Sequence, residues 1–295
     1  MRTDLPVISH GTSQISPACL VPGLDRQRLP ASQLGAGALP GPICEPRGGP
    51  ASAAVWPGEI RVLARTPPET MVRMNQWWPL AGLRLLTPRL ELRLPTNADL
   101  EELATLAAAG VHDPDVQPFA FPWTDAAPDE RARSTLQYHW RQRAAWQPEK
   151  WSLDLAVVHD GTVVGTQGMS ATDFAILREV GTGSWLGVAH QGQGIGTEMR
   201  AAVLHLAFGG LGALYATSGA FTDNPASHRV SRKLGYTDDG IERQISRGQA
   251  STVRRLRLDR DTWQANHSLP VSILGLQPCL PMFGLDAGQD YAASP

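Results

Sequence analysis

Residues 185–199, with the sequence WLGVAHQGQGIGTEM, constrain the fold more than any other part of the chain. Glycines alternate there at positions 192, 194 and 196, where an apolar strand ends and an amphipathic helix begins. Because glycine has no Cβ, the backbone can turn sharply and approach a ligand closely. The first amides of a helix have no partner within it and lie at the positive end of its dipole. The segment therefore predicts a backbone cradle for a phosphate or diphosphate.

Two common phosphate-binding loops do not match this segment. A P-loop requires a lysine after its glycines, and none follows here. A dinucleotide fingerprint that began at Gly192 would need a third glycine in place of Thr197. The pattern that does match is [QR]-x-x-G-x-[GA], with Gln191, Gly194 and Gly196. The hexapeptide alone is also compatible with a glycine-rich connection that binds nothing.

The flanking segments alternate between strand and helix patterns. Thr96 and Asp99 have the spacing of a capping box, and Asp160-Gly161 predicts a tight hairpin turn. The expected element order is β-α-α-β-β-β-α-β-α-β-β. We expect strands at 90–94, 152–159, 162–172, 179–188, 214–218, 241–246 and 252–258, and helices at 100–109, 128–146, from 195 to the glycines at 209 and 210, and at 225–234.

The glycine loop resembles the pyrophosphate loop of the GNAT superfamily of acyl-CoA N-acyltransferases. Further along, Asn224, Ser227 and the KLGY run at 233–236 resemble the last motif of that superfamily, in the same order. The resemblance covers about residues 86–258 and is closest to the branch of ribosomal-protein N-terminal acetyltransferases. It implies an α/β fold with a central mixed sheet that splays apart at the cofactor site and is flanked by helices.

The resemblance also implies acetyl-CoA as co-substrate, without a metal. The backbone of Leu186 and Val188 is expected to bind the pantetheine arm, with the Val188 amide donating to the thioester oxygen. Asn224 has two compatible interpretations, as the N-cap of a helix and as a side chain that reaches the pantetheine arm. The diphosphate is expected on backbone amides of one continuous run: Gln191, Gly192, Gln193, Gly194, Ile195, Gly196 and Thr197.

The catalytic groups are less evident. Many members of the family place a tyrosine general acid four residues before the glycine of the last motif, where this chain has Ser231. Ser227 matches the serine proposed for that role in the ribosomal branch, although it could be a plain helix residue. Glu179 is the candidate base, with Glu242 or a water chain as alternatives. Three histidines could also act as bases, and their spacing selects none of them: His112, His190 and His228.

The loop at 112–125 is expected to form the acceptor site. It combines Phe119, Phe121 and Trp123 with three aspartates, which suits a cationic amine, although it could also be an ordinary exposed loop. We therefore expect an N-acetyltransferase in which a primary amine, of a protein N-terminus or a small molecule, attacks the thioester directly. The alternative is a GNAT-fold acyl-CoA sensor without turnover.

The rest of the chain sets weaker bounds. Residues 1–75 are rich in proline and glycine and are expected to be disordered, or untranslated upstream of a start at Met71 or Met74. The acetyltransferase domain is expected at 76–264, followed by a partly docked tail at 265–295. A net charge of −2 makes nucleic acid an unlikely partner, and three scattered cysteines fit neither a disulfide framework nor a zinc site. Without an evident signal peptide or membrane span, we expect a cytoplasmic monomer or homodimer.

Overall fold

The computed structural model describes residues 61–62, 76–119 and 121–286. Its strands are β1 (Arg61–Val62), β2 (Arg84–Leu86), β3 (Leu90–Arg93), β4 (Lys150–His159), β5 (Thr162–Thr172), β6 (Glu179–Leu186), β7 (Tyr215–Phe221), β8 (Thr237–Ser246), β9 (Gln249–Asp259) and β10 (Ser272–Leu274). Its α-helices are α2 (Asn97–Ala109), α3 (Pro128–Ala144), α4 (Phe174–Leu177), α5 (Ile195–Leu204), α6 (Pro225–Lys233) and α7 (Arg260–Asn266). Shorter helical turns are η1 (Pro79–Gly82), η2 (Trp123–Asp125), η3 (Val188–His190), η4 (His205–Gly210) and η5 (Gln277–Phe283).

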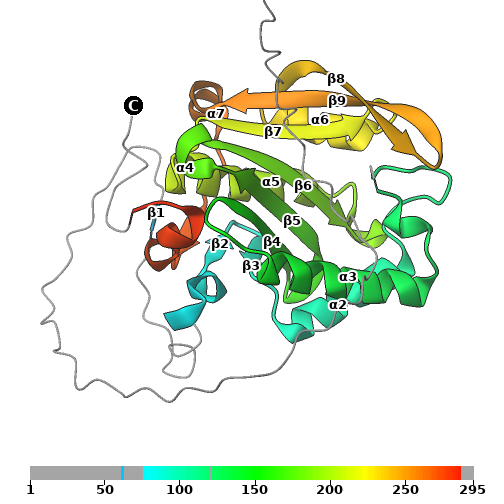
Figure 1. The fold of residues 1–295 in the computed structure, drawn as a ribbon, viewed down its shortest axis with the longest axis horizontal. Coiled ribbons are helices and arrows are strands. Elements are labelled where there is room, and N and C mark those ends of the chain that lie inside the picture. Colours follow the sequence, from blue (N-terminus) through cyan, green and yellow to red (C-terminus); the bar gives the residue numbers. More distant parts are fainter. Residues whose placement is uncertain (1–60, 63–75, 120, 287–295) are drawn as a thin grey trace, which may run out of the picture.

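The strands form one mixed sheet in the order β1-β10-β2-β3-β4-β5-β6-β7-β9-β8 (Figure 1). Within the described residues, neighbouring strands run antiparallel except for the parallel pairs β1–β10 and β6–β7. This arrangement confirms the mixed α/β fold that the sequence predicted. None of the described helices has the length and apolar character needed to cross a membrane.

Local sequence signals explain where the elements begin. The hydroxyl of Thr96 accepts a hydrogen bond from the Asp99 amide, and the Asp99 carboxylate accepts one from the Thr96 amide, at 3.2 and 2.8 Å. The predicted capping box is therefore present, and it starts α2 three residues earlier than the apolar pattern suggested. The turn at Asp160-Gly161 joins β4 to β5, and both residues have positive φ, which asparagine, aspartate and glycine tolerate best.

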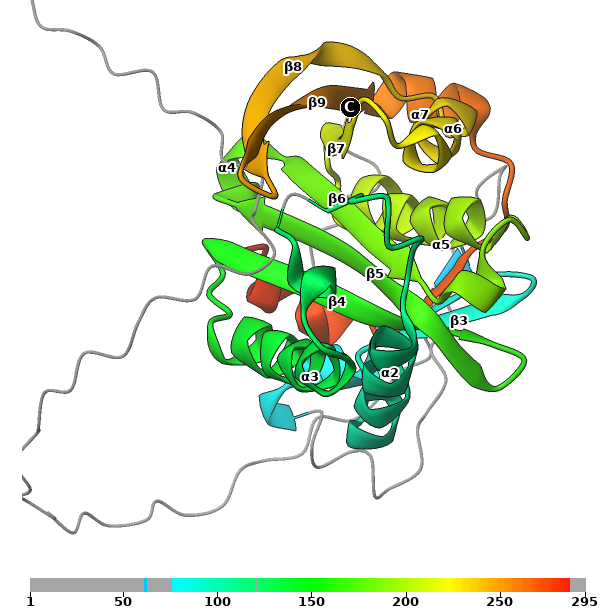
Figure 2. The same cartoon turned by 90° about the vertical axis from the view of Figure 1, so that its right-hand side faces the viewer.

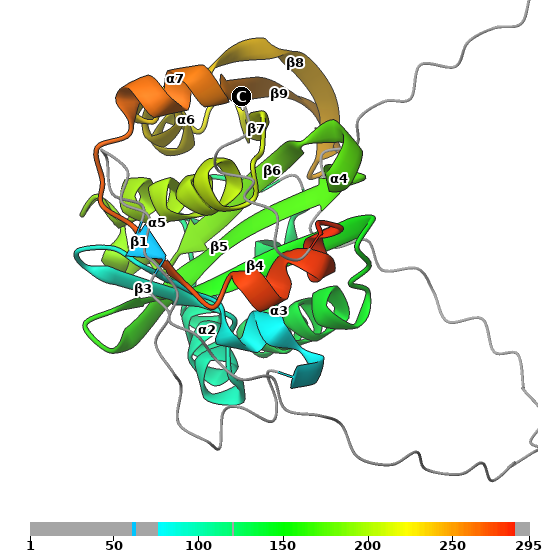
Figure 3. The same cartoon turned by 90° about the vertical axis from the view of Figure 1, so that its left-hand side faces the viewer.

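The two faces of the sheet carry different helices. Leu155 and Val157 of β4 belong to the large core that includes Met199 of α5. The intervening Ala156 and Val158 pack with Leu103 of α2. Successive side chains of a strand point to opposite faces, so α2 and α3 cover one face and α5 covers the other. Figures 2 and 3 show this sandwich from its two sides.

The parallel pair β6–β7 is interrupted partway along. Its register runs only from Glu179 opposite Tyr215 to Gly181 opposite Thr217. Residues 182–186 of β6 continue without pairing to β7, while β7 itself runs on to Phe221. The sheet therefore splays between these two strands, as the resemblance implied.

The C-terminal segment packs into the fold. β10 pairs with β2, and Ile273, Leu280 and Phe283 are almost completely buried in the large core. The expected domain boundary at 264/265 falls inside α7. The expectation for residues 1–75 lies outside the described residues, apart from Arg61–Val62, which pair with β10.

Candidate functional site

The glycine loop has the backbone geometry of a cradle at two of its three glycines. Gly192 and Gly194 have φ values of +75° and +82°, a region that other residues occupy only with strain. Gly196 has no positive φ, so backbone strain gives no reason for glycine there. A Cβ on Gly196 would lie 3.7 Å from Val230 of α6 and 3.9 Å from Leu186 of β6, so Gly196 lies between these two elements.

The amides available to a ligand form a shorter run than predicted. The Gln191 amide donates to the carbonyl of Val188 at 3.2 Å, and the Thr197 amide donates to that of Gly194 at 3.1 Å. The amides at 192–196 donate to no acceptor in the described part of the chain. These unpaired donors surround the N-terminus of α5, where the helix dipole favours an anion.

Side chains hold the loop on both flanks. The Gln191 amide group donates to the carbonyls of Val111 and Leu186 at 2.7 and 2.9 Å, which ties the loop to the end of β6. On the other flank, Arg89 donates to the carbonyl of Gln193 at 3.1 Å and forms an ion pair with Glu198 at 2.6 Å. Gln191 thus has a direct structural role through its side chain, whereas the sequence had suggested only its backbone amide.

Glu198 is nearly buried beneath the loop. Burial alone would raise the pKa of its carboxyl group, but hydrogen bonds from Thr87 and Arg89 outweigh this effect and keep the pKa below its ordinary value. The carboxylate therefore remains charged and fixes Arg89 beside the cradle.

The start of α6 brings the predicted Asn224 and Ser227 together. Oδ1 of Asn224 accepts a hydrogen bond from the Ser227 amide at 3.1 Å, which confirms the N-cap and makes no use of the Asn224 Nδ2. Ser227 is half-buried, one turn before Ser231. Ser231 is completely buried and accepts a hydrogen bond from Arg200 of α5 at 2.9 Å.

Glu179 lies at the closed end of the splay. Its carboxylate forms an ion pair with Arg257 of β9 at 2.8 Å. A strand rises about 3.3 Å per residue, so roughly 23 Å separate Glu179 from Leu186 at the other end of β6. Val188 follows in η3 and is largely exposed. The structure therefore places Glu179 far from the Val188 amide, and joint action of both residues at one thioester would require a water chain from Glu179.

Glycines occupy the face of β6 that is directed toward the acceptor loop. Gly181 and Gly183 lie on the side of the strand opposite to its buried side chains. A Cβ on Gly183 would contact nothing within 4 Å. Trp185 continues the same face, and its ring lies 5.9 Å from that of Trp123 in the loop. Phe119 extends the aromatic contact, at 5.3 Å from Trp123. The aromatic side chains of the acceptor loop therefore lie beside the part of β6 that Gly183 leaves uncovered.

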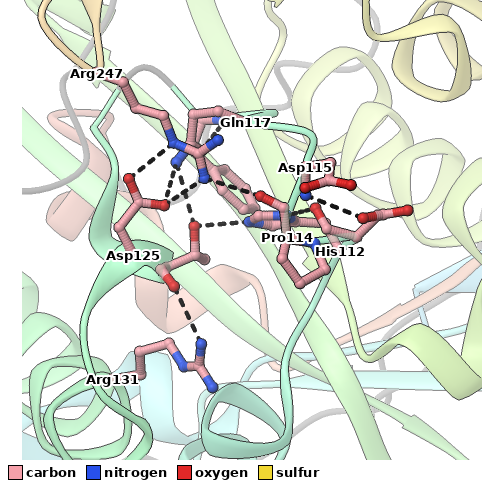
Figure 4. A network of polar contacts seen from close by, with 10 residues as sticks. His112, Pro114, Asp115, Gln117, Asp125, Arg131 and Arg247 are labelled. Atoms are coloured by element: carbon pink, nitrogen blue, oxygen red, sulfur yellow. Dashed lines mark hydrogen bonds and ion pairs between the residues drawn. The ribbon is translucent and has the colours of Figure 1, made fainter.

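Hydrogen bonds and an ion pair connect the acceptor loop to the turn between β8 and β9 (Figure 4). Arg247 donates to both carboxylate oxygens of Asp125, at 2.9 and 2.6 Å, and to the carbonyl of Pro114 at 3.2 Å. Nε2 of His112 lies 2.7 Å from the hydroxyl of Thr124 within the same network. Asp125 is therefore engaged by an arginine of the chain itself rather than presented to an acceptor.

Sequence reasoning missed a buried acid on this face. Asp154 of β4 accepts hydrogen bonds from Tyr138 at 3.1 Å and Ser152 at 2.8 Å, and burial raises the pKa of its carboxyl group. Its Oδ1 lies over Gly168, which pairs with Gly183 of β6. An aspartate inside the apolar run of residues 151–158 was the available signal.

A cavity of about 270 Å³ adjoins the other side of the cradle. Gly194 and Thr197 form one of its walls, and Lys233, Trp263 and His267 contribute to the others. Its lining includes Gly194, one of the residues whose amide is unpaired.

Comparison with known proteins identifies the family. The sequence model of the acetyltransferase (GNAT) domain matches residues 89–237. RimJ of Mycobacterium smegmatis, solved with a CoA-disulfide, is 17% identical with a TM-score of 0.54, over 69% of this chain and 95% of that chain. A putative acetyltransferase from T. thermophilus is 19% identical with a TM-score of 0.50, over 62% and 92%. RimL, described as a ribosomal L7/L12 alpha-N-protein acetyltransferase in complex with coenzyme A, is 19% identical with a TM-score of 0.49, over 60% and 97%.

The likenesses to RimJ and to the T. thermophilus protein, with TM-scores of 0.54 and 0.50, show the shared fold. The domain match covers half of the chain and includes β6, the cradle, α5 and α6. The chain belongs to the GNAT acetyltransferase family, whose members take their acetyl group from acetyl-CoA.

Proposed function

We propose that this protein transfers the acetyl group of acetyl-CoA to a primary amine by direct attack of the amine on the thioester. The proposal rests on two features that lie close together in one segment of the chain. Residues 182–186 of β6 face an open splay on one side and lead directly into the unpaired amides at 192–196. A diphosphate and a thioester at the two ends of one extended chain match this arrangement.

The residues fit the cofactor as follows. The amides at 192–196 receive the diphosphate, and the backbone of Leu186 and Val188 meets the adjoining part of the pantetheine arm. Asn224 contacts the arm with Nδ2, because its Oδ1 is occupied by the helix cap. Val188 lies next to the cradle, so we place the thioester further along β6, beside Ser184. When bound, acetyl-CoA supplies an already activated acetyl group, and holding both reactants in attack geometry accounts for most of the catalysis.

The amine approaches from the opposite face, over Gly183 and beside the contact of Trp185 with the acceptor loop. Glu179 is our candidate base, and it acts through water along the strip left open by Gly181 and Gly183. Ser227 is the candidate acid for the leaving thiolate. The aromatic side chains of the loop favour acceptors with an apolar or cationic part beside the amine, such as peptide N-termini, amino acids, aminoglycosides and polyamines.

Two measurements on the full chain test this function. Calorimetry measures the binding of coenzyme A, and a thiol-release assay with acetyl-CoA screens a panel of the four acceptor classes. We expect binding, and thiol release with at least one class. Binding without release for any amine would favour the acyl-CoA sensor instead, and absence of binding would refute both.

A further inference from the structure

A buried cation that has no carboxylate partner among the described residues lies between β6 and α6. Arg200 of α5 is 5% exposed. Its Nη1 donates to Ser231 of α6 at 2.9 Å, and its Nη2 lies 3.5 Å from the hydroxyl of Ser184 on β6. The guanidinium group therefore bridges the two walls of the gap between β6 and α6.

The surroundings of Arg200 do not neutralise its charge. Its two side-chain partners are neutral hydroxyls, and its Nε has no hydrogen-bond partner among the described residues. Burial lowers the pKa of Arg200, and the phenol of Tyr236 is the titratable group that interacts with it. A buried charge is costly unless an opposite charge compensates it. This arrangement is therefore suited to an anion that arrives with a ligand.

The position of Arg200 indicates which part of a ligand it would meet. Gly196 lies between Leu186 of β6 and Val230 of α6, close to the cradle. Arg200 follows it by four residues, on the same face of α5 and about 6 Å deeper. Ser184 lies correspondingly further from the cradle than Leu186 along β6. A chain that starts at the cradle and enters the gap therefore reaches the guanidinium group with its far end.

We propose that Arg200 stabilises the coenzyme A thiolate released in the transfer. This inference rests on the proposed function. The amine nitrogen forms a bond to the thioester carbon, the carbon–sulfur bond breaks, and its electron pair goes to sulfur. The proton of the new ammonium leaves through the base or water. Arg200 keeps its own protons and stabilises the charge on sulfur until water or a neighbouring hydroxyl protonates it.

The polar and charged groups that would surround the thiolate lie on the elements packed around Arg200. From β6, Ser184 and Thr182 contribute hydroxyls, and the Tyr236 hydroxyl lies 3.3 Å from that of Thr182. From α6, His228 is buried, with Nε2 bonded to the carbonyl of Phe221. On α5, Glu198 is directed away, toward Arg89. Arg200 is thus the charged group that the gap presents to sulfur among the described residues.

The test is an ultraviolet titration of the thiol of bound coenzyme A, followed by the absorbance of the thiolate. An opposite charge within about 4–6 Å lowers a pKa by roughly 1–3 pH units. We expect a decrease of this size for coenzyme A bound to the wild-type chain, a smaller one for Arg200→Lys, and none for Arg200→Met. Arg141→Met, on the exposed surface of α3, is the matched control and should behave as wild type.

Turnover gives a second readout. Arg200→Met should lower kcat about 10- to 100-fold, and Arg200→Lys should restore part of it. A wild-type complex whose bound thiol titrates as free coenzyme A does would overturn the inference, even if Arg200→Met failed to fold. So would a decrease that persisted in Arg200→Met. Failure of the wild-type chain to bind coenzyme A would overturn the proposed function itself, so the two failures are distinguishable.

Discussion

Substitutions at Gly194 and Gly196 separate the cost of backbone strain from the loss of ligand binding. Gly194 has a φ of +82°, so alanine there costs about 1–2 kcal/mol of folding free energy. Gly196 is the second residue of α5 and has no positive φ, and an added Cβ makes only ordinary contacts at 3.7 and 3.9 Å. Alanine at 196 should therefore leave stability unchanged or raise it by up to about 1 kcal/mol, since it removes the entropic cost of glycine in a helix.

Both sites should nevertheless lose affinity for coenzyme A. Valine at 196 adds two methyl groups beyond that Cβ, between Leu186 and Val230, where the cofactor arm is expected to enter. Displacing the diphosphate from its amides forfeits hydrogen bonds to a charged group, each worth about 1.5–3 kcal/mol, so Gly196→Val should weaken binding about 10- to 150-fold. Calorimetry with coenzyme A measures the affinity, and thermal unfolding measures the stability.

The control is Gly161→Ala, in the hairpin turn between β4 and β5. Its φ is +78° and an added Cβ there meets nothing within 4 Å, so it should lose about as much stability as Gly194→Ala. Its affinity for coenzyme A should equal that of wild type. A folded Gly196→Val variant that bound coenzyme A with wild-type affinity would refute the assignment of the cradle.

Four further outcomes are expected. If Ser227 protonates the thiolate, Ser227→Ala should lower kcat about 10- to 100-fold with little change in coenzyme A affinity. If Ser231 serves only to orient Arg200, Ser231→Ala should raise the pKa of the bound coenzyme A thiol. Asp125→Asn should loosen the acceptor loop from the β8–β9 hairpin, raising the KM for the amine several-fold while coenzyme A affinity stays constant; an unchanged KM would remove that loop from the acceptor site. Burial lowers the pKa of His139 from 6.5 to about 4, so the folded state favours the neutral imidazole. Between pH 6.5 and pH 4 the unfolded state binds a proton that the folded state does not bind. The contribution of His139 to the free energy of unfolding is therefore complete above pH 6.5 and is lost as the pH falls to 4. His139→Gln should therefore flatten the acid limb of the stability curve by up to about 3 kcal/mol, measured by urea unfolding against pH.

The elements that the sequence predicted well are those whose signals are local. The turn at Asp160-Gly161, the capping box at Thr96 and the N-cap at Asn224 depend on residues within a few positions of one another, and each is present. The short strands β2 and β10 were not predicted as strands. Each consists of three residues. β10 pairs with β2, a segment almost two hundred residues away, and no local pattern encodes that pairing. β2 pairs with β10 on one side and with the neighbouring β3 on the other.

The same limit applies within the site. Spacing alone located the cradle, because its amides come from consecutive residues. It could not show that the amides of Gln191 and Thr197 are already occupied, since their acceptors depend on how the turn closes. Nor could it distinguish Arg200 from the surface arginines of α3. An arginine in a helix is commonly solvated, and only the packing of α5 against β6 and α6 buries this one.

The two buried ionisable groups that spacing missed lie on opposite faces of the sheet. Arg200 is on the α5 face, beside Ser184, and Asp154 is on the α2 face, over Gly168 and next to the glycine strip of β6. Acetyl transfer by direct attack creates charge of both signs, positive on the nitrogen that approaches from the acceptor loop and negative on the sulfur that remains on the cofactor side. In the proposed reaction, the guanidinium group of Arg200 lies on the side where negative charge develops on sulfur, and the carboxyl group of Asp154, whose neutral form is favoured by burial, lies on the side of the amine. Such fixed groups need no reorganisation as the charges develop, and this advantage is greatest in a site from which water is excluded.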